Sequence, residues 1–167
     1  MRGAKWLGLR EDWAVVPFIS LTVLGFAVVV YDFAAIQGLG FSLSPVSLLG
    51  LVMLVFGGYL RVTSRRQLMR AGLTMLGSTQ LVTVEGQRLV TDGHYRRIRH
   101  PLYLGEITRN LGFTLVLASG YGFALVLLGS AFLLFRIRRE ERMMLEEFGD
   151  EYRQYMARTW RLIPHIY

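Results

Sequence analysis

The sequence predicts an all-α integral membrane protein with about four transmembrane helices, the last two of which form a C-terminal helical hairpin. Two observations indicate this class. The chain is 53% hydrophobic and has a positive mean hydropathy, which is more apolar than an ordinary soluble domain. Its apolar residues form long runs, and most of its Lys and Arg residues lie between or after those runs. No linker rich in Gly, Pro or Ser divides the chain, so we expect a single domain over residues 1–167.

The first predicted span covers residues 13–35, an apolar run interrupted by one charged residue. Its length is close to the roughly 20 residues that cross a bilayer as a helix. A cleaved signal peptide is the alternative, because Arg2 and Lys5 precede the run and Ala34 and Ala35 end it. The run is longer than the core of a signal peptide, so we interpret it as a membrane anchor.

Three further spans are predicted at about residues 45–62, 101–118 and 121–137. The second begins with Ser44 and Pro45, a capping residue followed by a proline in the first turn, which is typical of a helix start. Only Ser119 and Gly120 separate the third span from the fourth. Two long helices joined by so short a turn must be antiparallel neighbours, which predicts the hairpin.

The basic residues orient these spans, because Lys and Arg stay on the cytoplasmic side of short loops. Residues 37–44 and 119–122 contain no Lys or Arg, whereas residues 61–100 and 138–167 are rich in arginine. We therefore expect these two arginine-rich segments and both termini to be cytoplasmic. Juxtamembrane arginines bind an anionic lipid bilayer, which explains much of the net charge of +7 without a nucleic-acid partner.

The two cytoplasmic segments differ in their patterns. QLVTVEG and QRLVTDG place alternating apolar residues before an acid-glycine pair, which predicts short extended segments and turns. Residues 143–156 carry apolar side chains at roughly helical spacing with charges between them, which predicts an amphipathic helix. Gly149 is a candidate break in that helix.

Two small groups of residues are candidates for chemistry. His100 and Tyr103 flank Pro101, so both rings should project from the first turn of the third span, where the alternative is a solvated histidine and an interfacial tyrosine anchor. Glu140 and Glu141 lie at the cytoplasmic end of the fourth helix, just after its apolar run, and adjacent carboxylates there would attract a cationic ligand or an ammonium group. The competing interpretation is a surface i,i+4 ion pair between Arg136 and Glu140.

Other classes of site lack their sequence patterns. The chain has no cysteine, which excludes disulfides, thiolate catalysis and thiolate metal sites. Its three histidines have no spacing that favours a metal, and it has neither a dinucleotide-binding loop nor a nucleophile elbow. We therefore expect no metal.

Two stretches carry a resemblance to a known family. GQRLVTDGHYRRIRHPLYLGE at residues 86–106 closely resembles the G-x-x-L-V-x-x-G-x-Y-x-x-x-R-H-P-x-Y stretch of the isoprenylcysteine carboxyl methyltransferases. REERMMLEEFGDEYRQYMARTWRLIP, which ends at residue 164, resembles that family's C-terminal E-E…F-G-x-E-Y-x-x-Y…P block. Phospholipid methyltransferases share a looser form of the same pattern. The first half of the chain matches only in its hydrophobic character.

The resemblance implies methyl transfer from S-adenosylmethionine to a lipophilic acceptor, small or prenylated, by a single membrane methyltransferase domain with a cytoplasmic cofactor-binding region. It implies catalytic roles for Arg136, Glu140 and Glu141, with Arg136 as a candidate for holding an acceptor carboxylate. Residues implied to bind the cofactor come from both stretches: Gly93, Tyr95, His100, Tyr103, Glu140, Glu141, Leu162 and Pro164.

The acceptor stays open at this point, among lipophilic acids, amines, thiols and phenols. A carboxylate needs no general base, because the sulfonium already activates the methyl group, whereas an amine or thiol needs a proton acceptor. Two other functions are compatible with the pattern: a membrane reductase of lipophilic double bonds that uses a nicotinamide cofactor, since sterol reductases resemble this architecture, and a non-catalytic membrane scaffold.

Glu106 and Arg109 lie outside the family pattern, yet both are charged and both fall inside the third predicted span. Their spacing places them on one face of the helix, where a mutual ion pair would reduce the cost of burying each charge. The alternative hypothesis is that Glu106, Arg109 and Arg136 bind the acceptor.

Overall fold

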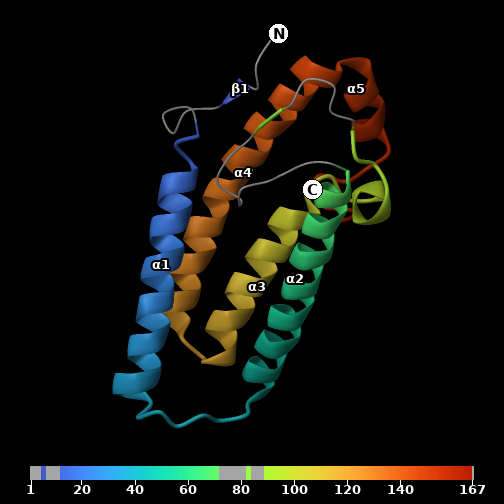
Figure 1. The fold of residues 1–167 in the computed structure, drawn as a ribbon. Helices are drawn as coiled ribbons and strands as arrows, with labels where there is room; N and C mark the ends of the chain where they lie inside the picture. Colours follow the sequence, from blue (N-terminus) through green and yellow to red (C-terminus); the bar gives the residue numbers. More distant parts are fainter. Residues whose placement is uncertain (1–4, 7–11, 72–81, 84–88, 167) are drawn as a thin grey trace.

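Four long helices lie side by side in the computed structural model, which describes residues 5–6, 12–71, 82–83 and 89–166 (Figure 1). These are α1 (Val15–Tyr31), α2 (Pro45–Arg70), α3 (Pro101–Val116) and α4 (Gly120–Phe148). A π-helical turn, η1 (Asp32–Ile36), extends α1, a 3-10 turn, η2 (Gly93–Arg96), precedes α3, and α5 (Asp150–Ala157) follows α4. Strands β1 (Lys5–Trp6) and β2 (Val82–Thr83) form a short antiparallel pair, so part of QLVTVEG is extended as predicted.

Among the residues that the structure describes, three helical segments are long and apolar enough to cross a membrane: Val15–Ile36, Pro45–Arg70 and Gly120–Phe148. The helical membrane class is therefore confirmed. The third predicted span is α3, a helix of 16 residues that carries two charged residues, so a count of four spans stays a prediction. Both α2 and α4 continue well past the predicted ends of their spans, because their arginine-rich ends keep a high helix propensity after the apolar run stops.

The helix ends follow the predicted signals. The Ser44 hydroxyl accepts a hydrogen bond from the backbone N–H of Ser47 at 3.1 Å, and Ser119 caps α4 in the same way through the N–H of Gly122 at 3.1 Å. Gly149 has a φ of +53°, which an L side chain rarely adopts, and it separates α4 from α5. The capping motif, the hairpin and the break at Gly149 are thus confirmed.

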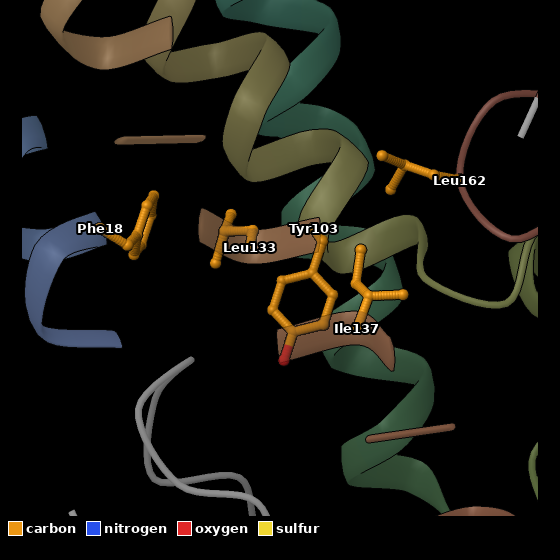
Figure 2. Close-up of a cluster of buried hydrophobic side chains, with 5 residues drawn as sticks. All are labelled: Phe18, Tyr103, Leu133, Ile137 and Leu162. Carbon is orange, nitrogen blue, oxygen red and sulfur yellow. The ribbon is translucent and has the colours of Figure 1, made fainter. Parts of the chain in front are cut away.

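The helices pack with the candidate residues at one end. The C-terminal halves of α2 and α4, the start of α3 and α5 share that end, while the 37–44 connection and the α3–α4 turn lie at the other (Figure 1). At the other end, the Ser119 hydroxyl donates to the buried Asp32 carboxylate, which explains how the first span accommodates a charge. A buried apolar cluster near the functional end joins α1, α3, α4 and the C-terminal segment (Figure 2), and consists of Phe18, Tyr103, Leu133, Ile137 and Leu162.

The contact between α2 and α3 is made backbone to backbone. A Cβ atom added to Gly57 would lie 2.4 Å from the Arg109 amide nitrogen and 2.7 Å from the Gly105 carbonyl oxygen. At a second point of the same contact, a Cβ on Gly112 of α3 would lie 2.5 Å from the Leu54 amide nitrogen of α2. Small residues allow this approach, and in a membrane such packing replaces the hydrophobic effect between helices.

Gly57→Ala should therefore destabilise the protein by about 1–3 kcal/mol, because the added methyl group forces the helices apart. Gly58→Ala is the matched control, since a Cβ at Gly58 meets nothing within 4 Å. Thermal unfolding of both variants in detergent measures the difference. Equal melting temperatures for the two variants would contradict a backbone contact at Gly57.

Candidate functional site

The site begins at the junction between η2 and α3. Pro101 occupies the first turn of α3, where its fixed φ favours the helix start, and His100 is the residue that caps it. The His100 and Tyr103 side chains lie with their ring centroids 5.7 Å apart. Both residues are buried, at 5% and 6% exposure, so they are neither a solvated histidine nor an interfacial anchor.

Two carboxylates of α4 flank His100. Its Nδ1 lies 3.9 Å from Glu140 Oε2, and its Nε2 lies 3.4 Å from Glu141 Oε1. The structure thus brings together four predicted site residues, which come from two segments far apart in the sequence. The two carboxylates beside His100 favour a positively charged group at this point.

Glu141 of α4 links two other segments of the chain, the residues before α3 and the C-terminal segment. Its Oε1 accepts a hydrogen bond from Arg99 Nε at 2.7 Å, and its Oε2 accepts one from Arg161 Nε at 2.7 Å. Arg99 also donates to backbone carbonyl oxygens of Met156, at 3.1 Å, and Thr159. The expectation that the whole basic run ahead of Pro101 faces an anionic membrane surface is therefore wrong for Arg99, whose side chain is only 7% exposed.

The backbone reinforces this junction. Residues 97–100 run beside residues 160–161, with hydrogen bonds from the Arg99 amide to the Trp160 carbonyl at 2.8 Å and from the His100 amide to the Arg161 carbonyl at 3.1 Å. Leu162 is buried against Tyr103 and its neighbours, whereas Pro164 is exposed. The C-terminal segment thus packs Leu162 against the Tyr103 cluster and leaves Pro164 at the surface.

Tyr95 and Gly93 belong to η2, which precedes His100 and α3 in the chain. The Tyr155 hydroxyl donates to the Tyr95 carbonyl oxygen at 2.7 Å, and this bond ties α5 to η2. Burial raises the pKa of Tyr155 to about 12, although Arg99 opposes the shift, so the hydroxyl stays a donor at physiological pH. Burial also raises the pKa of Tyr95 well above its usual range. Gly93 is exposed, with a φ of +53°.

Arg136 is the most buried charged residue of the site, at 1% exposure. The predicted alternative of a solvated pair with Glu140 is wrong, because the guanidinium instead lies 3.1 Å from Asp12 Oδ2. Its Cζ is 5.9 Å from the centre of the Tyr103 ring. Asp12 precedes α1, so this pair connects the first helix to the functional end of α4.

Several polar atoms at this point have no hydrogen-bond partner among the described residues. They are both Asp12 carboxylate oxygens, the Arg136 guanidinium nitrogens, the Tyr103 hydroxyl, Glu140 Oε2 and His100 Nε2. Buried polar groups are normally paired, because an unpaired one costs about 1–3 kcal/mol or more when charged. A bound ligand with complementary polar groups would supply the partners that these atoms lack.

A second polar network joins α2 to α3. Glu106 accepts a hydrogen bond from Arg109 at 2.6 Å and one from Asn110 at 3.2 Å, and it also pairs with Arg61 of α2. The predicted ion pair between Glu106 and Arg109 is present. Each of these charges has a partner within the protein, which packing alone would require, so an acceptor-binding role for Glu106 and Arg109 stays a prediction.

Asp12, Arg99 and Arg161 were not predicted as site residues. Arg99 could have been found, because it is the arginine adjacent to the His-Pro motif. No local pattern identifies the partners of Asp12 or Arg161, since each pairs with a residue distant in sequence. Among the described residues, no three His, Cys, Asp or Glu side chains are grouped as metal ligands.

The fold and the site together define a helical membrane protein with a buried, ligand-competent polar cluster at one end of its bundle. Comparison with known proteins identifies the family. The phospholipid methyltransferase family model matches residues 46–151, so the chain belongs to this family of membrane methyltransferases. The resemblance to the isoprenylcysteine carboxyl methyltransferases is confirmed by the relatives that follow.

The chain is 31% identical over 124 residues to protein-S-isoprenylcysteine O-methyltransferase B of Arabidopsis thaliana, covering 72% of this chain and 60% of that protein. It is 28% identical over 131 residues to a Delta(14)-sterol reductase of Mus musculus, covering 74% of this chain and 31% of that protein. The solved structure of a eukaryotic intramembrane Ras methyltransferase, isoprenylcysteine carboxyl methyltransferase, superposes with a TM-score of 0.71 at 27% identity, covering 89% of this chain and 52% of that one. The chain thus spans at most 60% of the length of these proteins.

Arg99→Ala should lower the free energy of unfolding by about 3–5 kcal/mol, because it removes one guanidinium from a buried ion pair and frees two carbonyl groups. Arg153→Ala is the matched control, since its pair with Asp150 is 71% and 83% exposed and should contribute at most about 1 kcal/mol. Chemical unfolding in detergent, followed by tryptophan fluorescence, compares the two. A loss no larger for Arg99→Ala than for Arg153→Ala would refute the fastening role of Glu141.

Proposed function

We propose that this chain is an S-adenosylmethionine-dependent methyltransferase that acts on a lipophilic acceptor at the cytoplasmic face of the membrane. The observation that carries the proposal is the buried polar cluster of His100, Tyr103 and Glu140, which forms where the family's two sequence blocks meet. The family membership and the named methyltransferase relatives support it.

The residues present fit such a cofactor. S-adenosylmethionine carries a sulfonium and an ammonium group, and Glu140 supplies an unpaired carboxylate oxygen for positive charge. The Tyr103 hydroxyl and the His100 ring, whose Nε2 lies 3.4 Å from Glu141, add polar groups beside it. Tyr95, Gly93, Leu162 and Pro164 would bound the remainder of the cofactor. Glu141, whose oxygens both accept arginine hydrogen bonds, would act by holding His100 in place.

The cofactor supplies an activated methyl group. The protein's task is then to align the acceptor with that group and to exclude water, which lowers the barrier without a metal or a covalent intermediate. The Phe18, Leu133 and Ile137 side chains surround Tyr103 and provide the apolar wall (Figure 2). Arg136, buried beside them, is our candidate for contacting the polar end of the acceptor, although Asp12 already occupies one side of its guanidinium.

A reductase is the second candidate, and the similarity to a sterol reductase favours it. In that case, the same cluster would hold a nicotinamide cofactor and reduce a lipophilic double bond. Titration of the purified protein with S-adenosylmethionine and with NADPH discriminates the two functions. Binding of neither cofactor would leave a non-catalytic scaffold.

His100→Ala, Tyr103→Phe and Glu140→Gln should each weaken S-adenosylmethionine binding by about tenfold, or roughly 1.4 kcal/mol, because each removes one polar contact to a charged ligand. Isothermal calorimetry measures the affinity, and the melting temperature serves as the control for folding. Glu146→Gln, a substitution on the exposed part of α4, should leave the affinity unchanged. Wild-type affinity in all three site variants would rule out this cluster as the cofactor site.

The proposed orientation predicts that residues 61–100, residues 138–167 and both termini face the cytoplasm. Reporter fusions after Gly40 and after Tyr167 should therefore report opposite sides of the membrane, because the connection at residues 37–44 has no basic residue. Detection of both reporters on the same side would exclude this topology.

A further inference from the structure

Asp12 lies where an acceptor carboxylate would be expected to bind. Its Oδ2 is 3.1 Å from the Arg136 guanidinium, and both side chains are buried, at 5% and 1% exposure. The position of Asp12 is fixed by its carbonyl oxygen, which accepts a hydrogen bond from the Val15 amide at 3.1 Å in the first turn of α1. The segment before the first helix thus places a carboxylate against the guanidinium that the proposed function assigns to the acceptor.

The charges around Arg136 disfavour an acidic acceptor. Glu140 and Asp12 both lie close enough to Tyr103 to act on it electrostatically, and Arg139 is the other cation near Asp12. The Arg136 guanidinium therefore already has one carboxylate partner, Asp12, before any acceptor enters. An acceptor carboxylate would be a second negative group beside it, and like charges in a buried site repel strongly. An uncharged acceptor meets no such repulsion.

The Asp12 carboxylate is ion-paired with Arg136 through Oδ2, and its Oδ1 makes no hydrogen bond among the described residues. Its contact with Arg136 is an ion pair without hydrogen-bond geometry, so neither of its oxygens has a hydrogen-bond partner among the described residues. Burial raises the pKa of Asp12 above the ordinary value of an aspartate, while Arg136 and Arg139 oppose the shift. The carboxylate is accordingly a stronger base than an exposed aspartate.

We propose that Asp12 determines the acceptor class of this protein: it selects an uncharged lipophilic acceptor whose nucleophilic atom carries a proton, namely a thiol, a phenol or an amine in its neutral form, and it accepts that proton. The inference rests on the proposed methyl transfer. In the reaction, a lone pair of the acceptor sulfur, oxygen or nitrogen forms the bond to the methyl carbon. The electron pair of the methyl–sulfur bond returns to the sulfonium sulfur, and the acceptor's proton passes to the Asp12 carboxylate. Arg136 holds the Asp12 carboxylate in an ion pair at Oδ2, which leaves Oδ1 to accept the proton.

The test uses the full chain in phospholipid vesicles with tritiated S-adenosylmethionine. The acceptors have matched alkyl chains and different head groups: dodecanethiol, dodecylphenol, dodecylamine and dodecanoic acid. N-acetyl-S-farnesylcysteine is added as a prenylated acid. We expect the wild-type protein to methylate at least one of the three protic acceptors and to prefer it to both acids. This preference can be measured without any variant.

Asp12→Asn should lower kcat for the protic acceptor about a hundredfold, a typical contribution of general-base catalysis, with little change in the affinity for S-adenosylmethionine. It should raise transfer to the two acids, because it removes the competing carboxylate from Arg136. Asp12→Glu should restore part of the rate for the protic acceptor and move the acidic limb of its pH profile. Asp32→Asn is the matched control, since Asp32 is also buried but lies at the opposite end of the bundle.

A wild-type preference for the acids would overturn the inference, as would an acceptor preference that Asp12→Asn leaves unchanged. If Asp12→Asn lowers only the melting temperature, to the same extent as Asp32→Asn, Asp12 is a structural counter-ion and the inference is wrong. The proposed function fails separately. Calorimetry that detects no S-adenosylmethionine binding to the wild-type protein would reject methyl transfer itself, whereas binding with the wrong acceptor preference rejects only the role of Asp12.

Discussion

The buried carboxylate of Glu141 is the interaction on which the functional end depends. It accepts hydrogen bonds from Arg99 and Arg161 and lies 3.4 Å from the His100 ring, so it joins the entry to α3, the body of α4 and the C-terminal segment. Three charged groups that are each expensive to bury alone become mutually satisfied. Because these segments bring Tyr103 and Leu162 into one buried cluster, the arrangement of the site depends on this junction.

Local signals predicted the helices well, since they depend on few residues. Apolar runs, the Ser44–Pro45 start, the Ser119 cap and the break at Gly149 act within one or two turns, and the structure contains all of them. The lengths of α2 and α4 were underestimated, because hydropathy marks where a helix enters lipid and not where its hydrogen bonding stops. The α2–α3 contact at Gly57 was not predictable from the sequence alone, since a glycine reveals a close approach only when its partner is known.

The site residues likewise fall into two groups, those that local motifs predict and those whose partners depend on the tertiary fold. His100, Tyr103, Glu140 and Glu141 were predicted because they lie in two motifs with fixed spacing, and the structure brings them together. The partner of Arg136 was predicted wrongly. The i,i+4 rule pointed to a residue on the same helix, whereas a buried guanidinium needs whichever carboxylate the tertiary fold supplies. That carboxylate precedes the first helix, in the half of the chain where the family pattern is weakest.

The two kinds of buried charge have different physical consequences. Both oxygens of Glu141 are satisfied by arginines from the protein, so its burial stabilises the junction and requires no ligand. Asp12 and Arg136 are equally buried, yet their donors and acceptors lack hydrogen-bond partners in the described part of the chain. Such a pair lowers stability relative to an apolar one of similar volume. Its presence beside Tyr103 is therefore better explained by an interaction with a ligand than by a contribution to folding. Glu141 thus stabilises the fold around the site, whereas the Asp12–Arg136 pair is available to a ligand.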